Sequence, residues 1–148
     1  MPPSFDFTRK IAEKELVFKH NVRYYMYVRV FKNTWFTRFA RKEDISDEEL
    51  RDIVKQLEAG QADADLGGDV YKIRIPRPGE GKSGGYRVIV FFRSEEKTFF
   101  VYGFAKSDRD NIGRGELRAF KNDAKDQLAL TDEQLKVWLE NKTLVEVI

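Results

Sequence analysis

Residues 86–92 read Tyr-Arg-Val-Ile-Val-Phe-Phe, and residues 98–102 read Thr-Phe-Phe-Val-Tyr. Both stretches are rich in β-branched and aromatic side chains, which is typical of strands. The polar residues 94–97 between them predict a turn, so we expect a hairpin. Because both strands are almost continuously apolar, we expect the hairpin in the middle of the sheet.

Residues 70–75, upstream of the hairpin, alternate between apolar and basic side chains. Because successive side chains of a strand point to opposite faces, Lys72 and Arg74 are predicted to share one face, away from the isoleucines. Further strands are predicted at residues 27–31 and 144–148. The Asp/Gly-rich residues 63–69 and the Pro/Gly-rich residues 76–85 are interpreted as loops.

Capping signals predict helices before and after these strands. Asn33 precedes apolar residues at helical spacing, and Ser46 and Thr131 each stand three residues before a Glu or Gln, the pattern of a capping box. Helices and strands without regular alternation predict an α+β fold, a small antiparallel sheet flanked by N-terminal and C-terminal helices. The helix residues expected in the core are Trp35, Phe36, Phe39, Ala40, Leu50, Ile53, Val54, Leu57, Leu117, Phe120, Ala124, Leu128, Leu135 and Trp138.

The length of 148 residues fits one domain, which we place at residues 26–148. Residues 1–25 have no clear periodicity, so they are interpreted as an N-terminal extension, with Met26 as an alternative start.

The chain has no cysteine, which suits a reducing compartment. It also has no apolar stretch of about 20 residues, so we expect a soluble, cytoplasmic protein without membrane contact.

Charge is segregated along the chain, although the net charge is only +2. Residues 70–93 carry six basic residues and one acidic residue, whereas residues 43–69 carry two basic and ten acidic residues. Cations and aromatic side chains on neighbouring strands suit RNA phosphates and bases, although simple solvation of a sheet surface would give the same pattern. The cluster contains Lys72, Arg74, Arg77, Lys82, Arg87 and Lys106, with Tyr86 and Tyr102 nearby.

Two loop motifs match ligand-binding patterns only in part. Residues 79–84 have the glycine spacing of a dinucleotide-binding turn, but a strand follows where that turn requires a helix. The aspartates of residues 63–69 suggest a calcium loop, yet its twelfth position is Arg74 instead of Glu. The only histidine is His20. We therefore predict no metal and no cofactor.

Five motifs lie in the central part of the chain: Asp-Ala-Asp-Leu-Gly-Gly at residues 63–68, Tyr-Lys-Ile-Arg at 71–74, Gly-Lys-Ser-Gly-Gly-Tyr-Arg at 81–87, Phe-Phe-Val-Tyr-Gly-Phe-Ala-Lys at 99–106 and Asn-Ile at 111–112. Together they resemble the RelE/HigB-type toxins of toxin-antitoxin systems, over residues 27–147. The resemblance implies a RelE-like sheet flanked by helices, a cognate antitoxin, and ribosome-dependent cleavage of mRNA that inhibits translation without a metal. It implies contact with DNA only through the antitoxin complex.

Cleavage of this kind lets a ribose 2′-OH attack the adjacent phosphate, and cations stabilise the charge that develops. We hypothesise that Arg74 and Arg87 clamp the phosphate, while a lysine supplies charge or transfers a proton. Tyr102 is expected either to act on the RNA or to pack in the sheet. The predicted catalytic set is Lys72, Arg74, Lys82, Arg87, Tyr102 and Lys106, and the predicted RNA-binding set is Arg77, Tyr86 and Arg93.

Two alternatives remain open from the sequence. Related toxins of the ParE kind act on gyrase without cutting RNA, and the sheet cations would then be incidental. A non-catalytic member that binds only RNA or its antitoxin is the second alternative, because the C-terminal residues 144–148 lack the histidine that several family members use.

Overall fold

The computed structural model describes residues 28–77 and 81–148, with only the backbone of residues 81–83. The predicted extension at residues 1–25, including His20, and the alternative start Met26 lie outside these ranges. The strands are β1 (Arg29–Asn33), β2 (Ala64–Gly67), β3 (Val70–Arg77), β4 (Gly81–Arg93), β5 (Lys97–Ala105) and β6 (Leu144–Glu146). The helices are α3 (Thr34–Glu43), α4 (Asp47–Glu58), α5 (Arg114–Leu128) and α6 (Asp132–Glu140).

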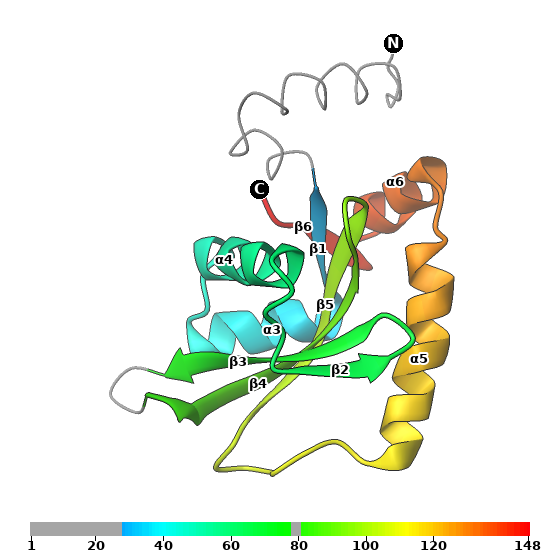
Figure 1. Ribbon diagram of the computed structural model, residues 1–148. Coiled ribbons are helices and arrows are strands. Elements are labelled where there is room, and N and C mark those ends of the chain that lie inside the picture. Colours follow the sequence, from blue (N-terminus) through cyan, green and yellow to red (C-terminus); the bar gives the residue numbers. More distant parts are fainter. Residues whose placement is uncertain (1–27, 78–80) are drawn as a thin grey trace.

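The strands form one sheet in the order β2-β3-β4-β5-β1-β6 (Figure 1). The predicted hairpin of β4 and β5 lies in the middle of the sheet, and the predicted C-terminal strand lies at its edge. Neighbouring strands pair antiparallel, except that β1 runs parallel to β5. These features confirm the predicted α+β fold with a mainly antiparallel sheet. No helix within the described ranges is long and apolar enough to cross a membrane.

Hydrophobic clusters cover both faces of the sheet, because the apolar faces of the helices pack against them. α3 and α4 cover one face with predicted apolar residues such as Phe36 and Leu50, both fully buried, whereas Trp35, also predicted for the core, is 42% exposed. α5 and α6 contribute Ala124, Leu128 and Leu135 to the other cluster. We name these the α3/α4 face and the α5/α6 face of the sheet.

The predicted capping signals place the helix starts correctly. The Asn33 side chain accepts from the backbone N–H of Phe36 at 2.7 Å, so it caps α3. Ser46 and Thr131 form capping boxes with the residues three positions later, at the starts of α4 and α6. These bonds satisfy backbone donors that a helix start leaves without intrahelical partners.

Two segments predicted as loops contain strand residues, which corrects that prediction. Residues 64–67 form β2, which pairs with the outer edge of β3. β3 continues to Arg77 and β4 begins at Gly81, with a register shift between Ile75 and Arg77. Glycine and proline favour turns in the local sequence. Such residues can still form a strand when the neighbouring strand has unpaired backbone groups at its edge.

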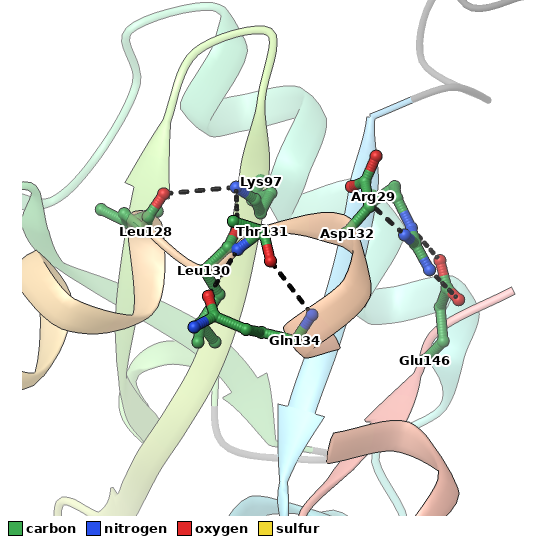
Figure 2. A network of polar contacts seen from close by, with 8 residues as sticks. All are labelled: Arg29, Lys97, Leu128, Leu130, Thr131, Asp132, Gln134 and Glu146. Carbon is green, nitrogen blue, oxygen red and sulfur yellow. Dashed lines mark hydrogen bonds and ion pairs between the residues drawn. The ribbon is translucent and has the colours of Figure 1, made fainter. Parts of the chain in front are cut away.

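A polar network joins the C-terminal elements to the sheet (Figure 2). Arg29 on β1 donates two hydrogen bonds of 2.9 Å to the carboxylate of Glu146 on β6. The Lys97 ammonium at the start of β5 donates to the carbonyl oxygens of Leu128 and Leu130, at 3.2 and 3.0 Å. Carbonyl groups at a helix end need such donors, so Lys97 fixes the end of α5 to the sheet.

Candidate nucleic-acid interface

Cations from two central strands share the α5/α6 face. Arg74 on β3 lies directly opposite Arg87 on β4. Lys72 lies two residues before Arg74, so its side chain is on the same face. Val70 and Ile89, each two positions from one of these cations, belong to the cluster that α5 and α6 cover, which identifies the face. The predicted phosphate clamp of two arginines is therefore brought together by strand register.

Arg74 and Arg87 have different environments. Arg87 is 7% exposed, so only a small part of this residue reaches solvent. The side chain of Arg74 is 40% exposed, and its Nε donates to Oδ1 of Asp63 at 3.0 Å. The other oxygen of Asp63 accepts from the backbone N–H of Arg74 at 2.6 Å. This carboxylate orients Arg74 through Nε, and the four N–H groups on its two Nη atoms remain as a fork for a phosphate.

Arg109, in the segment between β5 and α5, is a site residue that the sequence analysis missed. Its Nη1 donates to the hydroxyl of Tyr102 at 3.0 Å, and Nη1 and Nη2 donate to the carboxylate of Glu116 at 3.1 and 2.6 Å. Its guanidinium carbon lies 5.4 Å from the centroid of the Phe104 ring. Arg109 therefore joins β5 and α5 beside the arginine pair.

The ion pair between Arg109 and Glu116 shifts the pKa of both groups. Hydrogen bonds from Arg109, and then from the backbone N–H of Gly113, lower the pKa of Glu116 to about 2. The carboxylate of Glu116 raises the pKa of Arg109, with a further contribution from Tyr102. Both groups are therefore charged at neutral pH. In the sequence, Arg109 was one cation in a mixed-charge loop, and only the fold brings it to Tyr102.

The lysines of the predicted set have different positions. Lys72 donates from Nζ to Oδ1 of Asn111 at 3.4 Å, a contact between the sheet and the segment before α5. Lys106 is exposed directly after β5, where its backbone N–H donates to the carbonyl oxygen of Gly85 at 3.1 Å. The side chain of Lys82 lies outside the described part of the structure. Lys72 and Lys106 thus lie on strands or strand ends next to the arginine pair.

The predicted RNA-binding residues Arg77, Tyr86 and Arg93 do not join this group. Tyr86 is on the α3/α4 face and 4% exposed, and its hydroxyl donates to Glu43 at 2.7 Å. Burial, and then this hydrogen bond, raise the pKa of Tyr86. The guanidinium of Arg77 lies 5.3 Å from the centroid of the same ring. A ring buried in this way offers no face to a base.

Arg93 lies at the far end of β4 from Arg87 and pairs with Asp69, with 3.0 Å between nitrogen and oxygen. It is therefore placed to hold the turn between β2 and β3. In the described ranges, no group of three or more histidine, aspartate and glutamate side chains is arranged to hold a metal ion.

The site thus combines an arginine pair, flanking lysines and the Arg109-Tyr102 contact on one face.

Residues 28–147 match the family model described as the RelE toxin of the RelE/RelB toxin-antitoxin system. With this fold, the match defines the class of the protein as a toxin of a toxin-antitoxin system. The chain belongs to the RelE toxin family. This match confirms the resemblance found in the sequence. Toxins of this family pair with a cognate antitoxin.

Proposed function

We propose that this toxin is a ribosome-dependent mRNA endonuclease, which acts in the cytoplasm to arrest translation and is neutralised by its antitoxin. The observation that carries the proposal is the Arg74-Arg87 pair on opposite positions of β3 and β4. Two guanidinium groups at neighbouring strand positions suit the oxygens of one phosphodiester, because each guanidinium offers paired N–H donors. The domain at residues 26–148 contains all the residues that the proposal uses.

In the proposed reaction, the 2′-oxygen of a ribose attacks the adjacent phosphorus, and the bond from phosphorus to the 5′-oxygen breaks. The products are a 2′,3′-cyclic phosphate and a 5′-hydroxyl. Negative charge builds on the phosphoryl oxygens, where the largely buried Arg87 and the more exposed Arg74 would stabilise it. Catalysis would arise from charge stabilisation and from holding the attacking and leaving oxygens in line.

Proton transfer requires a group that accepts from the 2′-OH and one that donates to the leaving 5′-oxygen. Lys72, Lys82 and Lys106 are the candidates for the first role, and each must lose its own proton before it can act as a base. Tyr102 is the candidate for the second role. Its oxygen accepts from Arg109, which leaves the hydroxyl proton available for donation.

The proposal is tested by inducing the toxin with and without its antitoxin and mapping mRNA 5′ ends on translating ribosomes. The variant Arg74→Ala with Arg87→Ala should produce no new ends and no growth arrest. Arg93→Ala is the matched control, because it removes an arginine from the same strand at a position outside the site, and it should cleave like the wild type. Circular dichroism of each purified variant establishes that it is folded.

Two results would contradict the proposal. If the double variant cleaves mRNA like the wild type, the arginine pair is not the catalytic site. If the wild type arrests growth without new mRNA ends, the protein is not a nuclease, and a gyrase-directed or non-catalytic role takes its place.

A further inference from the structure

Trp35, in the first turn of α3, has an unusually open position. Its side chain keeps 42% of its surface exposed, more than any other aromatic residue in the described ranges. The next helical aromatic, Phe36, is fully buried. Aromatic side chains are normally among the largest contributors to a core, so an indole left in solvent beside a packed core is a candidate contact residue.

Neighbouring rings hold Trp35 in a defined place. Its ring centroid lies 4.5 Å from that of Tyr102, and 5.3 Å from that of Phe39, with which it stacks. The pairing of β1 with β5 ends at Lys32 and Phe100, so the first turn of α3 lies beside the next residues of β5. The Asn33 side chain, which caps α3, also donates to the carbonyl oxygen of Val101 at 3.1 Å. The indole is therefore fixed before any ligand arrives.

A continuous series of contacts leads from Trp35 to the arginine pair. The ring centroids of Tyr102 and Phe104 lie 6.0 Å apart, and Phe104 stands opposite Arg87 in the pairing of β4 with β5. Arg109 lies over both rings, with its guanidinium carbon 5.9 Å from Tyr102 and 5.4 Å from Phe104. Aromatic contacts thus run from the exposed indole of Trp35 through the half-buried Tyr102 to the buried Phe104, which stands opposite Arg87.

We propose that Trp35 is a base-stacking residue, which binds one unpaired nucleobase of a single-stranded RNA whose backbone phosphate lies at Arg74 and Arg87. This inference rests on the proposed nuclease function and adds the contact that positions the substrate. Bases of single-stranded RNA stack on exposed aromatic side chains, while adjacent cations track the backbone. A phosphate-binding surface next to the indole favours RNA over a protein partner, because an apolar protein contact would not need these cations.

The contact can be observed through tryptophan fluorescence, because the chain has two tryptophans. Trp138→Phe leaves Trp35 as the only tryptophan, whereas Trp35→Phe leaves Trp138 on α6 as a matched control. The probe is a short oligouridine with 2′-O-methyl groups, which lacks the attacking hydroxyl and remains intact. We expect the oligonucleotide to quench the Trp138→Phe protein and to leave the Trp35→Phe protein unchanged. Binding without quenching of Trp35 overturns the inference.

Affinity at several salt concentrations separates stacking from phosphate binding. Trp35→Ala should weaken oligonucleotide binding by about tenfold. It should do so at every salt concentration, because stacking releases no counterions. Arg74→Ala should weaken binding and also reduce the salt dependence, by about one phosphate contact. Trp35→Phe keeps an aromatic face and should retain most of the affinity, which excludes misfolding as the cause of the loss.

The inference and the proposed function fail in different ways. Unchanged affinity of Trp35→Ala overturns the stacking role, while cleavage that depends on Arg74 and Arg87 would still stand. Loss of antitoxin binding with normal RNA binding in the same variant would assign Trp35 to the protein interface and also overturns the inference. A wild type that does not bind the oligonucleotide overturns it as well, whereas the ribosome assay still decides whether the toxin is a nuclease.

Discussion

The carbonyl oxygen of Ile75 on β3 occupies the space in which a Cβ atom on Gly85 of β4 would lie. This close approach comes where the β3-β4 register shifts, between Ile75 and Arg77. Gly85 lies two residues before Arg87, so the register fixed here is the one that brings Arg87 opposite Arg74. The glycine motif that the sequence shows before Tyr86 therefore has a packing role at the edge of the site.

We predict that Gly85→Ala destabilises the protein by about 2–3 kcal/mol, because the added methyl group clashes with the backbone carbonyl of Ile75, which is held in the sheet. Gly115→Ala is the control, since a Cβ there meets nothing within 4 Å. In the first turn of α5, this change should be neutral or stabilise by about 0.5 kcal/mol. Urea denaturation measures both. Equal stability of the two variants would show that β3 and β4 do not approach each other so closely.

Glu116 makes the stability of the folded protein depend on pH in the acidic range. Its pKa is lowered from 4.5 to about 2, so its contribution to stability is fully present above pH 4.5 and is lost as the pH falls towards 2. The stability difference between wild type and Glu116→Gln should therefore be constant above pH 4.5 and shrink towards pH 2. Thermal unfolding between pH 2 and 7 measures the difference. Curves that stay parallel over this range would contradict the Arg109-Glu116 ion pair.

The elements that the sequence predicted well are those fixed by local patterns. The caps at Asn33, Ser46 and Thr131 depend on side chains within three residues of the backbone they bind. The alternation around Lys72 and Arg74 follows from strand geometry alone. β2 was missed because its residues carry turn-forming glycine and aspartate, and they form a strand only because the edge of β3 is open to them.

The candidate site was predicted in the same uneven way. Arg74 and Arg87 were predicted to act together because both belong to the basic cluster of the central strands, and the register of β3 and β4 places them opposite each other. Tyr86 was assigned to RNA from its place beside Arg87 in the sequence, but alternation directs it to the opposite face and Glu43. Arg109 was missed because it lies in a loop without a sequence pattern, and only the fold brings it to Tyr102. Trp35 was missed as a site residue because it contacts Tyr102 from a segment that is distant in the sequence.

Lys97 should matter for stability because it supplies donors at the end of α5. Lys97→Met removes the ammonium that binds the carbonyl oxygens of Leu128 and Leu130, and we predict a loss of about 1–2 kcal/mol. Lys125→Met removes an exposed lysine from the last turn of the same helix and should cost less than about 0.5 kcal/mol. Urea denaturation compares the two variants. Hydrogen exchange of residues 128–132 should accelerate only in Lys97→Met.

Tyr86→Phe separates a structural role from an RNA-binding role. The buried hydroxyl of Tyr86 donates to Glu43 on α3, so its removal leaves a carboxylate without that donor. We predict a loss of about 1–2 kcal/mol in the free energy of unfolding. Tyr71→Phe is the control, because within the described ranges the Tyr71 hydroxyl has no hydrogen-bond partner, and its loss should cost less than about 0.5 kcal/mol.

Substitutions of Tyr86 also test the assignment of the faces. Tyr86 lies on the α3/α4 face, so Tyr86→Phe should cleave mRNA and bind oligonucleotide like the wild type at temperatures where it stays folded. A base that stacked on this ring would still stack on phenylalanine, so Tyr86→Leu is also needed to remove the aromatic face. If Tyr86→Leu remains folded and still binds RNA normally, the binding surface is confined to the α5/α6 face. A folded Tyr86→Leu protein with weakened RNA binding would instead extend that surface to the α3/α4 face.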